Sequence, residues 1–278
     1  YKFIFMDTKA IKSLGQNFLM DQSVIDRILS VAEVHEHDRI FEIGPGTGAL
    51  TQALSQTGAS VLAIEIDQQL VERLNRIFVQ SENVSILEGS ILDVNVEELL
   101  AHAGYEYQGY KVVANIPYYI TAPIIRTLLS LRSQASSITL MVQDEVAERV
   151  VAKPGSMSIL SVMVQYYAEA EKCFFVPRTA FDPVPAVDSA VLKLIPKHRF
   201  QASEDRHVFR VVRAGFSARR KTLANNLTNA FHLERARIER LFAALGIEPM
   251  IRAQELSIAE WRALADLVAG EIDAPPAE

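Results

Sequence analysis

The 278-residue sequence contains very few of the residues that would indicate a disulfide-stabilised, metal-binding or membrane-spanning protein. Cys173 is the only cysteine, so no internal disulfide can form. The six histidines are scattered without the spacing of metal ligands. No run approaches the roughly 20 apolar residues that cross a membrane, and the apolar segment 1–6 is too short for a signal peptide. These absences predict a cytoplasmic protein without a metal or a membrane.

An excess of positive charge is absent too, because 28 Lys and Arg stand against 34 Asp and Glu and give a net charge of −6. Such a balance argues at first against nucleic-acid binding, since contacts to phosphates need cationic side chains. The charge is distributed unevenly, however. Residues 193–240 carry 12 Lys and Arg against 4 Asp and Glu, a net of +8. This basic segment indicates either a nucleic-acid surface or merely a solvated helical face.

The periodicity of the apolar residues, which form 49% of the sequence together with Tyr, Trp and Cys, changes along the chain. Between residues 39 and 142, short buried strands alternate with helical patterns, which predicts βαβ units around a parallel sheet. Two later β-rich runs, 161–176 and 189–195, lack an obvious helix between them and predict an antiparallel edge. Beyond residue 205 the pattern is helical throughout.

We therefore predict an α/β fold with a second, smaller domain. Residues 1–198 would form a Rossmann-like domain with an antiparallel edge on its sheet, and residues 199–272 a small all-α domain. Residues 273–278, with two prolines and two acids, are predicted to be a disordered tail.

A glycine-rich turn after the first strand predicts a cofactor site. Gly44 and Gly46 permit a tight turn and a close approach of a ligand, toward which the next helix directs its N–H groups. This spacing also fits the dinucleotide fingerprint, so the turn alone does not exclude NAD. Glu42 favours a sulfonium- and ammonium-bearing ligand over NAD, whose pyrophosphate it would repel. Glu65 suits a bidentate hydrogen bond, through both carboxylate oxygens, to ribose hydroxyls in either case. A turn without a ligand is the less favoured interpretation.

The tetrapeptide Asn115-Ile116-Pro117-Tyr118 stands at the end of the fourth predicted strand, 111–115. This is the sheet edge where open α/β folds bind ligands. The Asn115 side-chain oxygen and the Pro117 carbonyl can each accept one hydrogen of the exocyclic N6 amine of adenine. They would draw this poorly nucleophilic nitrogen toward tetrahedral geometry and aim its lone pair at a methyl donor. Tyr118 would offer an aromatic face to the extruded base. The alternative is an ordinary strand-end turn.

A second aromatic residue stands at the start of the proline-containing loop 181–189. The prolines stiffen this loop, so we predict that it holds Phe181 as the opposite stacking face for the base. A place in the hydrophobic core is the alternative for Phe181, and it is the commoner fate of a phenylalanine.

Together these motifs resemble those of the ribosomal RNA adenine N6,N6-dimethyltransferases. The resemblance covers almost the whole chain, including segment 15–19, the glycine-rich turn, the tetrapeptide and loop 181–189. Two C-terminal stretches, 216–227 and 252–257, resemble the bacterial small-subunit dimethyladenosine transferases and not the Erm macrolide-resistance methyltransferases of the same family.

The resemblance implies an S-adenosylmethionine methyltransferase sheet, with S-adenosyl-L-methionine as the cofactor. It also implies the transfer of four methyl groups to two adjacent adenosines, in a hairpin near the 3′ end of 16S rRNA in the immature 30S subunit. Motifs and resemblance together predict the catalytic residues Asn115, Pro117, Tyr118 and Phe181. They predict the cofactor-binding residues Gln16, Asn17, Leu19, Glu42, Gly44, Gly46, Glu65, Ser90 and Asn115.

Two further expectations concern the basic segment and the adenine of the cofactor. Arg219, Arg220 and Lys221 would start a helix that grips the rRNA backbone. Ser90 stands where the family usually has an aspartate that contacts the cofactor adenine. A neutral hydroxyl is a weaker acceptor, so we predict a lower cofactor affinity than is typical of the family. Nothing in the sequence demands more than a monomer.

Three alternatives remain open at this stage. An Erm-like enzyme would methylate 23S rRNA, and the C-terminal motifs disfavour it. An assembly or transcription factor would keep the fold without needing catalysis, and the intact glycine-rich turn and tetrapeptide argue against it. A nicotinamide-dependent oxidoreductase is the most distant of the three.

Overall fold

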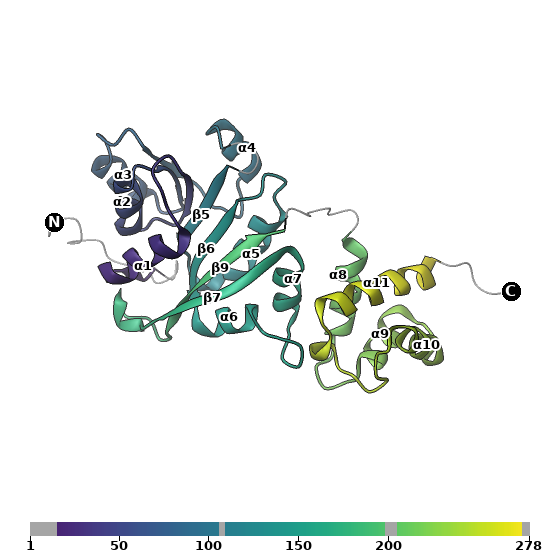
Figure 1. Cartoon of the computed structure of the whole chain (residues 1–278). Helices are drawn as coiled ribbons and strands as arrows, with labels where there is room; N and C mark the ends of the chain where they lie inside the picture. Colours follow the sequence, from purple (N-terminus) through teal and green to yellow (C-terminus); the bar gives the residue numbers. More distant parts are fainter. Residues whose placement is uncertain (1–15, 106–108, 198–204, 274–278) are drawn as a thin grey trace. The chain divides into compact units, whose positions relative to one another are not determined.

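The computed structural model describes residues 16–105, 109–197 and 205–273 (Figure 1). Gly15, residues 198–204 around the predicted domain boundary, and residues 274–278 of the predicted tail lie outside the described residues. The described residues fall into two compact units. The first is drawn from Tyr1–Glu148 and Ala168–His198, and the second from Arg149–Tyr167 and Arg199–Glu278. Residues 149–167, which the sequence analysis placed in the first domain, therefore pack with the C-terminal helices.

The first unit is built on one seven-stranded sheet with the order β4-β3-β2-β5-β6-β9-β7. Neighbouring strands from β4 through β6 are parallel, whereas β9 is antiparallel to both β6 and β7. This arrangement confirms the predicted α/β fold with an antiparallel edge. In chain order the strands are β2 (Arg39–Ile43), β3 (Ser60–Glu65), β4 (Val84–Glu88), β5 (Tyr110–Asn115), β6 (Ser137–Gln143), β7 (Ala168–Val176) and β9 (Ser189–Pro196).

Helices flank this sheet, as its buried apolar strands require. Each of Ile40, Phe41, Val112 and Val113 is almost fully buried, which explains why the strand segments have no polar face. Asp21 caps the first helix by accepting a hydrogen bond from the Ser23 N–H. The helices are α1 (Gln22–Ala32), α2 (Ala49–Gln56), α3 (Gln68–Ile77), α4 (Val96–His102), α5 (Thr121–Ser130) and α6 (Asp144–Val150).

The β-rich assignment of residues 161–176 was wrong in its first half. Helix α7 (Ile159–Tyr167) runs directly into β7, and only Ala168–Val176 is strand. Ser158 and Ser161 start the helix by exchanging hydrogen bonds, since the Ser158 N–H donates to the Ser161 hydroxyl and the Ser161 N–H to the Ser158 hydroxyl. A short apolar run does not by itself distinguish a buried helix from a strand, and here the serine pair at its start decides.

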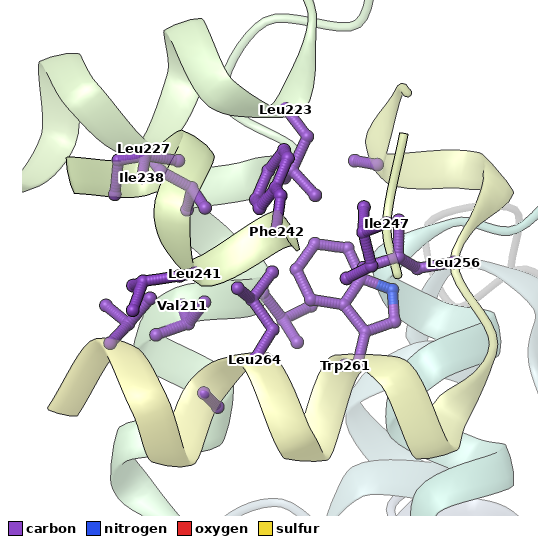
Figure 2. Close-up of a cluster of buried hydrophobic side chains, with 14 of the residues drawn as sticks. Val211, Leu223, Leu227, Ile238, Leu241, Phe242, Ile247, Leu256, Trp261 and Leu264 are labelled. Atoms are coloured by element: carbon purple, nitrogen blue, oxygen red, sulfur yellow. The ribbon is translucent and has the colours of Figure 1, made fainter. Parts of the chain in front are cut away.

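The second unit is helical, as predicted, and packs around Trp261 (Figure 2). Val162 of α7 belongs to the same hydrophobic cluster as Val211, Phe242 and Leu264, which is why α7 groups with this unit. The last helix continues to Asp273, one residue into the segment predicted to be a disordered tail. The helices are α8 (Arg206–Gly215), α9 (Leu223–Phe231), α10 (Arg235–Leu245) and α11 (Ile258–Asp273).

Two further features of the described residues concern membrane-spanning helices and metal sites. No helix among them is both long and apolar enough to cross a membrane. Within the same residues, no group of three or more His, Cys, Asp or Glu side chains is placed to hold a metal ion.

Candidate cofactor and target-base site

One pocket of the first unit lies where four parallel strands end. The loops after β2, β3, β4 and β5 form its floor and walls, and the segment around Gln16–Leu19 closes one side. Sequence-predicted residues from separate parts of the chain meet here because the carboxyl ends of parallel strands share one sheet edge. The predicted residues that line this pocket are Gln16, Asn17, Leu19, Glu42, Gly44, Gly46, Glu65, Ser90, Asn115, Pro117 and Tyr118.

Two glycines shape the floor of the pocket. Gly44 has φ of +66°, and a Cβ there would lie 3.9 Å from the Asn115 carbonyl oxygen. Gly46 has φ of +57°, and a Cβ there would lie 3.2 Å from the Phe18 ring. Side chains at either position would be strained by the positive φ, and one at Gly46 would also crowd the Phe18 ring. The glycines thus keep the backbone open to a ligand.

Glu42 is buried in the floor, with only 1% of its surface exposed. Its Oε2 atom accepts no hydrogen bond from the described residues. Burial raises the pKa of Glu42 to about 8, and the nearby Glu65 carboxylate also raises it. A cationic ligand or a hydrogen-bond donor in the pocket would satisfy this oxygen, whereas a phosphate would not.

The second acid, Glu65, is already held by the backbone. Its Oε1 accepts hydrogen bonds from the Ile66 and Asp67 N–H groups at 2.9 and 3.0 Å, and its Oε2 accepts one from the Gly46 N–H at 3.1 Å. Burial nevertheless raises its pKa. A carboxylate offers about four acceptor positions, so the one open position is on Oε2. This differs from the expected two-oxygen contact to a ribose, because the backbone occupies Oε1.

Glu42 has a measurable consequence for the cofactor-free protein. Since its folded pKa of about 8 lies above the ordinary value of 4.5, the folded state holds a proton that the unfolded state has lost between these pH values. The stabilisation is complete below about pH 4.5 and is lost as pH rises through 8. We expect Glu42→Gln to remove this dependence, so that the variant gains stability relative to wild type from pH 5 to pH 9. Urea unfolding of both proteins at pH 5 and pH 9 measures the free energy of unfolding. An equal change in this free energy for wild type and variant would contradict the prediction.

The tetrapeptide after β5 presents its polar groups to the same pocket. The Asn115 Nδ2 atom donates to the Asn17 carbonyl at 3.5 Å, which leaves Oδ1 as a free acceptor. The Pro117 carbonyl accepts a hydrogen bond from the Ile120 N–H at 3.3 Å, and a carbonyl oxygen has a second lone pair. Tyr118 is half-buried, and its hydroxyl lies 2.7 Å from the Ser189 hydroxyl. Two hydrogen-bond acceptors and an aromatic ring therefore line one wall of the pocket.

Phe181 does not join them, in contrast to the predicted stacking role. It is 3% exposed, packs in the hydrophobic core of the first unit and does not line the pocket. Its backbone forms the short strand β8 (Phe181–Asp182), which pairs with β1 (Phe18–Leu19) so that Phe181 faces Leu19. The core alternative is thus the one this structure shows, because the ring fills apolar space behind the N-terminal strand.

Sequence reasoning missed two aromatic residues that do line the pocket. Tyr119 is 60% exposed, and Phe18 lies against Gly46. Both stand beside predicted residues, Tyr119 next to Tyr118 and Phe18 between Asn17 and Leu19. An exposed aromatic residue adjoining a catalytic motif was the available signal for Tyr119.

The remaining cofactor candidate, Ser90, lies in the loop after β4. Its hydroxyl accepts a hydrogen bond from the Leu92 N–H at 3.3 Å. One acceptor position of this neutral group therefore serves the loop itself, which further limits what it offers to a ligand.

The basic residues Arg219, Arg220 and Lys221 are exposed in the second unit and form no ion pair with any described residue. They were predicted to start a helix. Instead they occupy the turn before α9, and Thr222 caps that helix. Asn226 holds this turn from beneath, because its Nδ2 donates to the Gly215 and Ala218 carbonyls at 2.6 and 3.1 Å. The turn thus presents three cations on a fixed backbone.

Three more arginines precede this turn on one face of α8. Arg206, Arg210 and Arg213 are exposed and spaced four and three residues apart, which places them along one side of the helix. Sequence analysis recognised the basic segment but not this row, although the spacing was available as a signal. The second unit therefore carries a row of exposed arginines on α8 in addition to the Arg219–Lys221 turn.

Comparison with known proteins shows the family of the chain. The family model for "Ribosomal RNA adenine dimethylase" matches residues 7–269. Ribosomal RNA small subunit methyltransferase A of Bacillus cytotoxicus is 42% identical over 262 residues, covering 92% of this chain and 90% of that protein. The protein of the same name from Bacillus mycoides is 41% identical over the same shares.

Solved structures show the same relationship. A dimethyladenosine transferase from Plasmodium falciparum matches with a TM-score of 0.73 and 26% identity, over 89% of this chain and 95% of that one. The 23S rRNA methyltransferase ErmE matches with a TM-score of 0.69 and 26% identity, over 91% and 100%. With the family model spanning nearly all of the sequence, the chain belongs to the ribosomal RNA adenine dimethylase family of S-adenosylmethionine-dependent methyltransferases.

Proposed function

We propose that the chain dimethylates the N6 amines of two adjacent adenosines, in a hairpin near the 3′ end of 16S rRNA in the immature 30S subunit. The observation that carries this is the single pocket in which the buried acid Glu42, the strand-end acid Glu65 and the Asn115–Tyr118 tetrapeptide meet. The 42% identity to a small-subunit methyltransferase favours small-subunit RNA over the 23S RNA of ErmE, at 26%. We expect a cytoplasmic monomer without a metal.

The pocket fits S-adenosylmethionine by the chemistry of its donors. Glu42 has an unsatisfied buried oxygen, which suits the ammonium and sulfonium charges of this cofactor. Glu65 keeps one acceptor position on Oε2 for a ribose hydroxyl, and Gly44 and Gly46 leave space for close approach. When bound, the cofactor supplies an electrophilic methyl group on its sulfonium.

The chain's own residues then act on the target base. The Asn115 amide is oriented by its bond to the Asn17 carbonyl, so its oxygen is available to accept one N6 hydrogen. The Pro117 carbonyl accepts the other through its second lone pair. Both bonds concentrate the nitrogen lone pair, and both strengthen as positive charge develops on nitrogen, so they stabilise the transition state more than the ground state. No general base is required, because the N–H proton becomes acidic once the methyl bond forms and is then lost to solvent.

Methyl transfer to defined RNA tests the proposal. Labelled S-adenosylmethionine is incubated with immature 30S particles that lack the modification, and with large-subunit RNA as the control. We expect dimethyladenosine in 16S rRNA only. Label in 23S rRNA would instead support the ErmE-like function that the structural similarity makes the second candidate. No label in either RNA, with measurable cofactor binding, would favour a factor that binds RNA without catalysis.

Ser90 is expected to limit cofactor affinity. Replacing it with aspartate in Ser90→Asp restores a charged acceptor, and charge-assisted hydrogen bonds are roughly twice as strong as neutral ones. We expect S-adenosylmethionine to bind about fivefold more tightly, a gain of about 1 kcal/mol. Calorimetric titration measures this, with Ser90→Ala as the matched variant that should bind no better than wild type. An unchanged dissociation constant in Ser90→Asp would refute the adenine contact.

The basic turn is expected to contribute affinity for RNA without reading its sequence. Replacing Arg219, Arg220 and Lys221 together with alanine should weaken rRNA binding and reduce the slope of log affinity against log salt by about 2 to 3, if each cation contacts one phosphate. Cofactor affinity should not change, because these residues are absent from the pocket lining. Filter binding from 50 to 300 mM salt measures the slope. An unchanged slope would place the RNA contact elsewhere.

A further inference from the structure

Ser189 is the residue of loop 181–189 that contacts the catalytic tetrapeptide. Its hydroxyl lies 2.7 Å from the Tyr118 hydroxyl. Phe181, at the other end of the loop, points into the core and does not line the pocket. The contact therefore links loop 181–189 to the tetrapeptide through Ser189. The sequence analysis had selected Phe181, at the other end of the loop.

Ser189 is held rigidly. It is 0% exposed and is the first residue of β9, where it pairs with Gln143 of β6 on one side and Val176 of β7 on the other. The preceding residue, Asp188, is fixed twice, since its side chain accepts from the Arg178 N–H at 2.9 Å and its carbonyl accepts from the Asp144 N–H at 3.0 Å. Because Ser189 is fixed in this way, it holds the Tyr118 ring in place, and the ring does not hold Ser189.

Tyr118, by contrast, begins a short 3-10 turn, Tyr118–Ile120, at the sheet edge. The backbone of this turn does not by itself fix the two side-chain torsions that orient the Tyr118 ring. Burial raises the pKa of its hydroxyl, and Asp188 raises it too, so the group stays protonated at neutral pH. It is available as a hydrogen-bonding anchor and is a poor proton acceptor.

We propose that Ser189 is a positioning residue for methyl transfer, which anchors the Tyr118 hydroxyl so that the ring presents its face to the extruded base. This inference rests on the proposed function. The antiparallel edge of the sheet thereby takes part in the reaction, because β9 supplies the anchor for a residue that follows β5. In this arrangement the ring contacts the base, and the hydroxyl hydrogen-bonds with Ser189.

A double-mutant cycle tests the inference. Ser189→Ala and Tyr118→Phe each remove one side of the same hydrogen bond, so each should lower the single-turnover rate about tenfold, the loss expected for one hydrogen bond of about 1.4 kcal/mol. The double variant should be no slower than either single variant. The dissociation constant of Ser189→Ala for S-adenosylmethionine should stay within twofold of wild type, since Ser189 does not line the pocket.

The matched control is Tyr110→Phe, which removes a buried tyrosine hydrogen bond at the far end of β5, where the Tyr110 hydroxyl donates to the Ser133 carbonyl at 2.6 Å. It should lower stability and leave the rate unchanged. Thermal unfolding of all variants separates loss of fold from loss of rate.

The alternative outcomes are distinct. Additive losses, about a hundredfold in the double variant, would overturn the inference because they show independent roles. A rate loss in Tyr118→Phe alone would overturn it by placing the hydroxyl on RNA. Absence of methyl transfer in wild type would instead refute the proposed function itself.

Discussion

Replacing Asn115 with alanine is expected to lower the single-turnover rate of methyl transfer by a factor of about 10² to 10³, the usual cost of deleting one preorganised hydrogen-bonding group that acts in a transition state. The Asn115 oxygen is free to accept an amine hydrogen because its nitrogen donates to the Asn17 carbonyl. Measuring the rate with cofactor and RNA both saturating restricts the effect to the chemical step.

Asn95→Ala provides the control for this experiment. The Asn95 side chain caps α4 by accepting from the Glu98 N–H and is absent from the pocket lining. Its loss should cost roughly 1 kcal/mol of stability and leave the rate intact. A rate for Asn115→Ala within fivefold of wild type would rule out its amide as an acceptor for N6. The protein would then need another group to activate the nitrogen.

The second large effect is expected on folding. Trp261 is 0% exposed at the centre of the helical unit (Figure 2). Its ring is stacked on that of Phe216, with ring centroids 5.6 Å apart. It packs so tightly on α8 that a Cβ at Gly215 would lie 2.4 Å from its ring. Trp261→Ala should destabilise the second unit by about 3 to 5 kcal/mol through the cavity it leaves.

This destabilisation should separate the two activities of the chain. The pocket is lined only by residues of the first unit, so S-adenosylmethionine should still bind with wild-type affinity. Affinity for rRNA should fall to that of the variant lacking Arg219–Lys221, because Gly215 and Asn226 hold that turn within the same packing.

Calorimetry should show a new unfolding transition at lower temperature. Loss of cofactor binding in parallel would show that the units fold as one. Met250→Ala, on an exposed side chain of the second unit, is the control.

Much of the fold and the cofactor site was predictable because those features depend on local residue chemistry. Short segments of sequence are enough to predict the glycines at positive φ, the acids at strand ends and the alternation of strands and helices. Parallel topology then brings the strand ends together. Asp67 illustrates this: aspartate is a favoured residue at the start of a helix, and the Asp67 side chain caps α3 by accepting from the Gln69 and Leu70 N–H groups.

The tertiary structure decided the features that depend on distant partners. Whether Phe181 faced a base or the core depended on the pairing of β8 with β1. The role of Ser189 needed β9 placed between β6 and β7. The unit to which α7 belongs depended on Val162 packing with the helices beyond residue 205. The sequence by itself determined the family, the cofactor chemistry and the motifs, because these reside in residue types at short spacings. Only the packed chain decided which side chains of those motifs face the pocket, because burial is set by neighbours that are remote in sequence.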